Sequence, residues 1–133
     1  MPDIPIPGRK PVPPSARRCN EAGRNLIKAW ESLHDGDPGT PALEPAMCPV
    51  KVWTVGWGHA LTDAAGRQIV GPARRAEAMA VYRSRWPAGM TLADAGALFD
   101  ADLIPRERSV SGMVAAPLTG NQFSALVSLV YNI

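Results

Sequence analysis

The sequence predicts an α+β fold, in which a small sheet follows the first helix and further helices follow the sheet. Apolar residues recur at three- and four-residue steps over residues 19–33, and β-branched and aromatic residues are punctuated by glycine over 50–59. Two further helical patterns follow residue 90, each begun by a capping box or a close variant of one. A chain of 133 residues is long enough for one such domain and too short for a second independent core.

Composition places the chain among folded proteins. Hydrophobic residues make up 46% and charged residues 20%, with a net charge of +2. Residues 1–30 hold six basic and two acidic groups, a net +4 that could favour an anionic polymer, although solvated surface charge is the commoner explanation. We expect no nucleic-acid partner, because the sequence offers neither a basic recognition helix nor an aromatic platform.

Targeting signals are not visible in the sequence. It has no run of about 18 apolar residues and no apolar stretch in its first 15 residues, which predicts neither a membrane span nor a signal peptide. We therefore expect synthesis in the cytoplasm. Residues 1–15 contain six of the fourteen prolines and are predicted to be a disordered, polyproline-like tail before a folded domain over 16–133.

The first predicted helix begins at Ser15 or Asn20, either of which could cap it, and ends near Glu31 to Leu33. Its apolar stripe comprises Cys19, Ala22, Leu26, Ile27, Trp30 and Leu33. Glu31 ends this stripe beside Trp30, where desolvation would raise the pKa of a carboxyl group and make it a proton donor. A solvated glutamate at a helix end is the alternative.

A long proline- and glycine-rich loop is predicted over 35–49, followed by short strands over 50–59 and a third strand around 68–70. Helices are then predicted over Ala73–Trp86, from Thr91 to about Ser109, and from Thr119 to the end of the sequence. The last helix carries Phe123, Leu126, Val127, Leu129, Val130 and Ile133 without an ending signal. This pattern suggests packing partners further along a longer chain.

Several segments together resemble the phage-type lysozymes, the endolysin muramidases of glycoside hydrolase family 24. They are AGRNLIKAWE ending at Glu31, Cys48, Thr54 within VWTVGWGHALT, residues 89–103 and residues 116–133, in the order of the family. The resemblance implies a lysozyme-like α+β fold, with a small N-terminal sheet lobe joined by a helix to a mainly helical lobe. It also implies hydrolysis of the β-1,4 bond between N-acetylmuramic acid and N-acetylglucosamine in peptidoglycan. Carried over residue by residue, the catalytic positions are Glu31, Cys48 and Thr54.

In such a reaction one group protonates the leaving oxygen while another positions water on the opposite sugar face. Glu31 would be the acid, and Cys48 with Thr54 would hold or activate the water, with the inverting outcome that the family implies. A thiol with the ordinary pKa of about 8.5 is a weaker base at pH 7 than an aspartate. Asp35 and Asp37 therefore remain candidates for the second carboxylate and for binding substrate.

The aromatic and histidine residues of the same segment have two interpretations each. Trp53 and Trp57 can stack on sugars or pack in the core, and we expect one of each, with Trp57 as the substrate-binding residue. His59 could be a general base, but the resemblance implies a structural pair with Asp102. The spacing of the cysteines and histidines fits no zinc motif, so no metal or cofactor is predicted, and Cys19 and Cys48 are expected to stay unpaired.

The chain departs from the family pattern in four places. Sixteen residues separate Glu31 from Cys48, more than is usual; Ser32 replaces the usual glycine; Ala73–Trp86 is a helix of only some members; and the family's C-terminal helices are missing after Ile133. The resemblance implies peptidoglycan as partner, action on the cell wall after release, and a holin as the route of access. The alternative is an inactive, truncated remnant, or a wall-binding protein without turnover.

Overall fold

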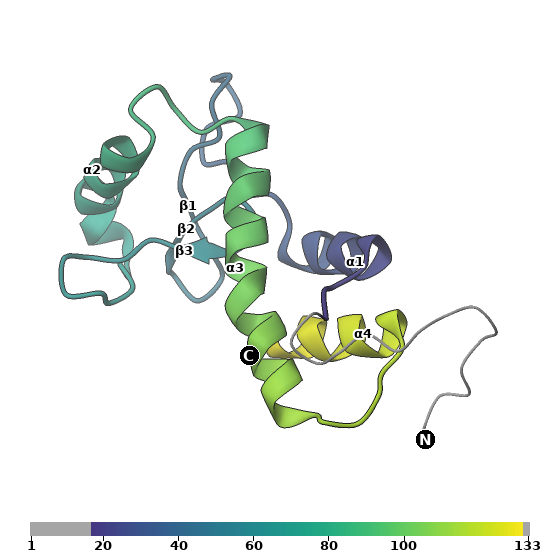
Figure 1. Cartoon of the computed structure of the whole chain (residues 1–133). Helices are drawn as coiled ribbons and strands as arrows, with labels where there is room; N and C mark the ends of the chain where they lie inside the picture. Colours follow the sequence, from purple (N-terminus) through teal and green to yellow (C-terminus); the bar gives the residue numbers. More distant parts are fainter. Residues whose placement is uncertain (1–16, 132–133) are drawn as a thin grey trace. The chain divides into compact units, whose positions relative to one another are not determined.

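A computed structural model describes residues 17–131, which form two compact units. One contains residues 17–30 and 101–131, and the other is Glu31–Asp100. The described residues contain four α-helices and a three-stranded antiparallel sheet, which confirms the predicted α+β class (Figure 1). The predicted tail over residues 1–15, including Ser15, and the terminal Ile133 lie outside the described residues.

Helix α1 spans Glu21–Glu31 and begins where the sequence predicted, because the Asn20 side chain caps it. Asn20 Oδ1 accepts a hydrogen bond from the backbone N–H of Gly23 at 2.9 Å. The helix ends at Glu31, and Ser32 follows with a left-handed φ of 59°. Glycine adopts this conformation without steric cost, whereas serine does so only at a cost.

Only part of the predicted apolar stripe of α1 is buried. Cys19, Gly23 and Ile27 are buried, whereas Leu26, Trp30 and Leu33 are 49%, 72% and 37% exposed. The reason is a close approach within the same unit: a Cβ added to Gly23 would lie 2.4 Å from Cβ of Ser124 on α4. Helix α1 thus packs through its glycine, a residue that a search for apolar side chains overlooks.

The segment before α1 is fixed to the helices of its own unit. The guanidinium of Arg17 donates to the carbonyl oxygens of Val114 and Ala116 at 2.9 and 2.8 Å. The buried Glu107 carboxylate accepts the backbone N–H of Cys19 at 2.6 Å. These bonds satisfy backbone groups at the ends of two helices.

The sheet consists of β1 (Ala46–Met47), β2 (Trp53–Val55) and β3 (His59–Ala60), in the order β1-β2-β3. Strand β1 lies inside the segment that was predicted to be a loop, so that prediction was wrong for these two residues. The predicted third strand is also wrong: residues 68–70 form only isolated bridges, between Val52 and Val70 and between Thr62 and Gln68. In both places the partner strand decides the pairing, which local composition does not reveal.

The core of the unit Glu31–Asp100 lies between the sheet and α2. Helix α2 (Arg75–Arg85) follows a 3₁₀ turn over Pro72–Arg74, close to the predicted Ala73–Trp86. Tyr82 on α2 donates through its hydroxyl to the carbonyl oxygen of Leu43 at 2.6 Å and accepts the N–H of Met90 at 2.8 Å. The buried cluster consists of Trp53, Val55, Leu61, Ile69, Ala78, Tyr82, Met90 and Ala95.

The last two helices begin at the predicted capping boxes. Helix α3 spans Leu92–Met113, with reciprocal bonds between Thr91 and Asp94, and α4 spans Gly120–Tyr131, with the same bonds between Thr119 and Gln122. Helix α3 continues beyond the predicted end near Ser109.

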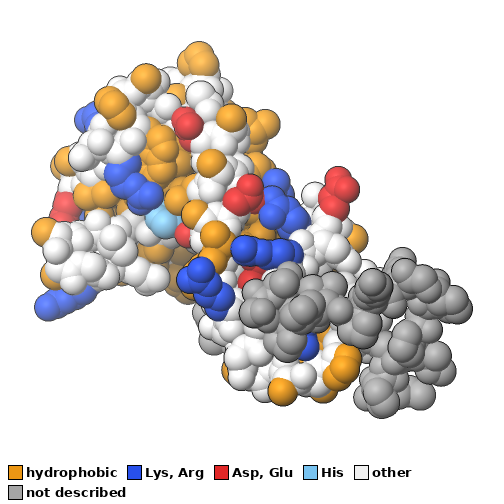
Figure 2. Space-filling view, viewed as in Figure 1, with side chains coloured by type: hydrophobic (Ala, Val, Ile, Leu, Met, Phe, Trp, Pro, Cys, Tyr) orange, Lys and Arg blue, Asp and Glu red, His pale blue; other side chains and the backbone are white. Residues whose placement is uncertain are grey.

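On α4 the buried face carries Phe123, Ser124, Val127, Ser128 and Tyr131, while Leu126 and Val130 are half-buried and Leu129 is 61% exposed. Figure 2 shows hydrophobic side chains (orange) at several separate places on one face of the molecule. None of the helices between residues 17 and 131 is long and apolar enough to cross a membrane.

Candidate functional site

Glu31 is half-buried at the C-terminal end of α1, and its carboxyl group lies against the turn between β2 and β3. A Cβ added to Gly58 of this turn would be 2.6 Å from Oε2 of Glu31 and 3.1 Å from its Cδ. Gly58 also has a φ of 82°, a left-handed conformation that favours glycine. Only a glycine therefore fits beneath this carboxyl group. The predicted desolvation of Glu31 beside Trp30 stays a prediction, and Trp30 itself is 72% exposed.

His34 fixes the other glycine of the turn. Its backbone N–H and its ring both contact the carbonyl oxygen of Gly56, with N···O and Nδ1···O distances of 2.8 and 3.1 Å. Because a carbonyl oxygen only accepts, the ring contact assigns a proton to Nδ1. Sequence reasoning gave His34 no role in the site, and its spacing contained no signal that could have found it.

Cys48 and Thr54 converge on one backbone carbonyl. The buried hydroxyl of Thr54 donates to the oxygen of Val52 at 2.9 Å, and the N–H of Cys48 donates to the same oxygen at 3.0 Å. Thr54 also lies opposite Ala46 of β1 and Ala60 of β3 in the ladder. The hydroxyl proton of Thr54 is thus directed at the oxygen of Val52. The hydroxyl oxygen can therefore only accept a hydrogen bond from any further partner.

Asp35 and Asp37 shape the loop after α1. Oδ1 of Asp35 accepts the N–H groups of Asp37 and Glu44 at 3.1 and 3.3 Å, and Oδ1 of Asp37 accepts that of Gly39 at 3.0 Å. These are turn-forming bonds of the kind that aspartate commonly makes. At least one oxygen of each carboxylate is therefore used within the loop.

The two tryptophans differ as expected in burial. Trp53 is buried in the core, and its indole N–H donates to the carbonyl oxygen of Gly71 at 2.8 Å. Trp57 is half-buried, packs against that core and meets Phe99 edge to face with ring centroids 6.0 Å apart. A role of Trp57 in binding sugar stays a prediction.

Comparison with known proteins identifies the family of the chain. The profile of the family described as phage lysozyme matches residues 39–133, most of the chain. The chain belongs to the phage lysozyme family. Cys48, Thr54, Trp57, His59 and Asp102 lie within the matched residues, and Glu31 precedes them.

A solved structure also resembles this phage lysozyme family member. It is the muramidase domain of SpmX from Asticaccaulis excentricus, with a TM-score of 0.54 and 28% sequence identity. The match covers 87% of this chain and 59% of that one, so the chain spans less than two thirds of that structure. A search of curated protein sequences finds no match.

The lysozyme unit Glu31–Asp100 contains all but one of the predicted site residues: Glu31, Asp35, Asp37, Cys48, Thr54, Trp57 and His59. Asp102 lies on α3 in the other unit, and its pairing with His59 stays a prediction. Within its own unit, Nε2 of His59 lies 3.1 Å from a guanidinium nitrogen of Arg85. Since an arginine only donates, this contact requires a lone pair on Nε2.

Cysteine and metal chemistry complete the description. Cys19 and Cys48 are both free thiols, as predicted. Burial raises the pKa of the Cys19 thiol, with a smaller opposing effect from its hydrogen bond to Ser124. No group of three or more metal-ligating side chains occurs among residues 17–131.

Proposed function

We propose that the chain is a muramidase of the endolysin type, which hydrolyses the β-1,4 bond between N-acetylmuramic acid and N-acetylglucosamine. The observation that carries the proposal is the packing of the Glu31 carboxyl group against Gly58, in the same unit as Cys48 and Thr54. Membership of the phage lysozyme family and similarity to a muramidase domain support a peptidoglycan hydrolase.

Glu31 is the general acid in this proposal. It protonates the glycosidic oxygen as the bond breaks through an oxocarbenium-like transition state. The close fit between its carboxyl group and Gly58 restricts the side chain, because movement toward the turn is blocked by the Gly58 backbone. A restricted acid holds its proton in the direction of the leaving group, which is what positioned general acid catalysis requires.

Thr54 and Cys48 position the attacking water. The Thr54 hydroxyl donates to Val52, so its lone pairs accept a hydrogen bond from water and fix its orientation. Cys48, whose backbone N–H donates to the same carbonyl, makes the second contact with this water. Attack by the water on the opposite face of the sugar gives inversion. Asp35 and Asp37 remain the alternative second carboxylates, although the turns of the loop already use them.

The substrate and its location follow from this proposal. The enzyme acts on the cell wall after release from the cytoplasm, with a holin as the partner that opens the way, and lyses the cell. The second candidate is a wall-binding protein without turnover.

The decisive experiment compares Glu31→Gln with Glu21→Gln, an exposed glutamate at the other end of the same helix. Clearing of a peptidoglycan suspension should fall at least ~10²-fold in Glu31→Gln, because the amide keeps the shape and lacks the proton. Glu21→Gln should retain full activity. If wild type pulls down with cell walls but clears no suspension, the wall-binding candidate replaces the muramidase.

A further inference from the structure

A pocket of about 220 Å³ lies in the unit Glu31–Asp100, between the long loop, the edge of the sheet and α2. The loop contributes Asp37, Glu44 and Pro45, β1 contributes Met47, and α2 contributes Arg75 and Met79. Glu31, Cys48 and Thr54 are not among the lining residues. The pocket is thus separate from these three proposed catalytic groups, although Asp37, an alternative second carboxylate, lines it.

The direction of the side chains on β2 explains this separation. Trp53 lines the pocket, and Thr54 is the next residue of the same strand. Successive side chains of a strand point to opposite faces of the sheet. The pocket therefore lies mainly on the face of Trp53 and its ladder partner Met47, and it reaches the edge strand β1 at Ala46, the partner of Thr54.

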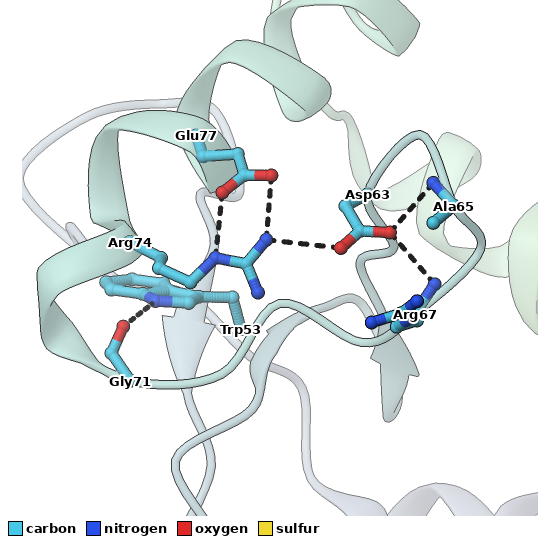
Figure 3. Close-up of polar contacts among 7 residues, drawn as sticks. All are labelled: Trp53, Asp63, Ala65, Arg67, Gly71, Arg74 and Glu77. Atoms are coloured by element: carbon cyan, nitrogen blue, oxygen red, sulfur yellow. Dashed lines mark hydrogen bonds and ion pairs between the residues drawn. The ribbon is translucent and has the colours of Figure 1, made fainter.

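The basic group of the pocket has no partner within residues 17–131. Arg74, its neighbour in sequence, has two acidic partners: it binds Glu77 through two nitrogens at 2.8 Å and Asp63 at 3.2 Å (Figure 3). The same contacts lower the pKa of Glu77, and the backbone N–H of Arg67 is the main cause of the lowered pKa of Asp63. No such hydrogen bond or ion pair involves Arg75, which is exposed and is one of the residues that line the pocket.

The acidic groups of the pocket are only partly used. Oδ1 of Asp37 accepts the N–H of Gly39, and Oε2 of Glu44 accepts the hydroxyl of Thr40 at 3.3 Å. The other oxygen of each carboxylate has no hydrogen bond among the described residues. The lining of the pocket thus combines two acidic residues and one basic residue with the apolar residues Trp53, Met47 and Met79.

We propose that this pocket binds the peptide part of peptidoglycan, through a residue that carries both an ammonium group and a carboxylate. This inference rests on the proposed function. Asp37 and Glu44 receive the ammonium, and Arg75 receives the carboxylate in the planar, two-bond geometry that guanidinium groups favour. The diamino acid of a peptidoglycan stem peptide has both charges, whereas the uncharged sugars have no ionic group that could pair with these residues.

The size of the pocket agrees with a peptide residue. At about 220 Å³ it is smaller than the ~300 to 1,000 Å³ that is typical of drug-sized ligands. It therefore suits one or two amino-acid residues and not a run of several sugars. The methylene chain of a diamino acid would lie on the methionine and tryptophan side chains of the pocket.

The test is a titration of the full chain with three probes, in which NMR monitors the signal of the Trp53 indole N–H. The probes are the tripeptide L-alanyl-γ-D-glutamyl-meso-diaminopimelate, the same peptide with its amines acetylated and its carboxylates amidated, and tri-N-acetylchitotriose. The charged peptide should shift the Trp53 signal, and the other two probes should not.

Variants of the pocket identify the contacts. Arg75→Gln should weaken peptide binding about 3- to 5-fold and the double variant Asp37→Asn, Glu44→Gln about 5- to 10-fold, as expected for partly exposed ion pairs. The amides keep the acceptor oxygens that the loop uses. Arg83→Gln is the matched control, because Arg83 is exposed on the same helix and does not line the pocket.

Each outcome decides the proposal. Equal binding of the charged and uncharged peptides, no binding of either, or equal weakening by Arg83→Gln and Arg75→Gln would overturn it. Glu31→Gln should bind the peptide as wild type does. Peptide binding without any hydrolysis would therefore reject the proposed function and keep the pocket, while hydrolysis without peptide binding would reject the pocket alone.

Discussion

The backbone of Gly58 lies directly beneath the carboxyl group of Glu31, so close that a single methyl group at position 58 would come within 2.6 Å of Oε2. This contact joins the end of α1 to the turn between β2 and β3 within one unit. It gives the glycine a role in positioning the proposed acid, beyond its role in the turn.

Gly58→Ala should therefore damage both stability and activity. A left-handed φ costs an alanine ~1 kcal/mol, and the methyl group must also displace Glu31. We expect wall clearing to fall at least ~10-fold, as displacement of a positioned catalytic group predicts. Gly66→Ala is the control, because Gly66 also has a positive φ but has nothing within 4 Å of the added Cβ. Equal effects of the two variants on activity would refute the positioning role.

Ser32→Gly should stabilise the protein. Ser32 adopts a φ of 59° at the end of α1, a conformation that glycine adopts without steric cost. The free energy of unfolding should rise by ~0.5 to 1 kcal/mol. Ser84→Gly, at an exposed position inside α2, should lower it by a similar amount. Chemical denaturation of both variants measures the difference, and a destabilised Ser32→Gly would contradict the prediction.

The ring of His34 should be replaceable by asparagine and not by glutamine. An asparagine amide nitrogen occupies nearly the position of Nδ1, from which it can donate to the carbonyl oxygen of Gly56. His34→Ala and His34→Gln should lose ~0.5 to 1.5 kcal/mol of stability, and His34→Asn should lose less. Thermal unfolding ranks the three variants. Identical losses in all of them would show that only the backbone of residue 34 matters.

At position 48, aspartate should maintain or raise activity and alanine should reduce it, because a carboxylate is a better base than a thiol at neutral pH. Initial rates of wall clearing measure both. If Cys48→Ala is fully active, the role passes to Asp35 or Asp37, and their asparagine variants should then be the damaging ones.

The two thiols should differ in reactivity. Cys19 is buried with a raised pKa, so less of it is thiolate at a given pH, whereas Cys48 is half-buried. Iodoacetamide at pH 8 should therefore modify Cys48 first in the native protein. Mass spectrometry should find two labelled thiols after denaturation without reduction, and fewer would indicate an unexpected disulfide.

Local sequence signals determined much of this protein. Asn20, Thr91 and Thr119 begin their helices as their side chains predicted, because a cap is an interaction between residues three apart. The glycines at 56 and 58 marked the turn, because glycine by itself allows the backbone conformations that a tight turn needs. The ordered family motifs placed Glu31, Cys48 and Thr54 in one segment of the chain.

The tertiary structure decided what depends on distant partners. Strand β1 exists because Ala46 lies opposite Thr54, and Gly23 is buried because Ser124 comes against it. The bond from His34 to Gly56 joins residues 22 positions apart, and the pocket combines a loop, a strand edge and a helix. Such contacts depend on which backbones meet in space, and neither periodicity nor composition records that.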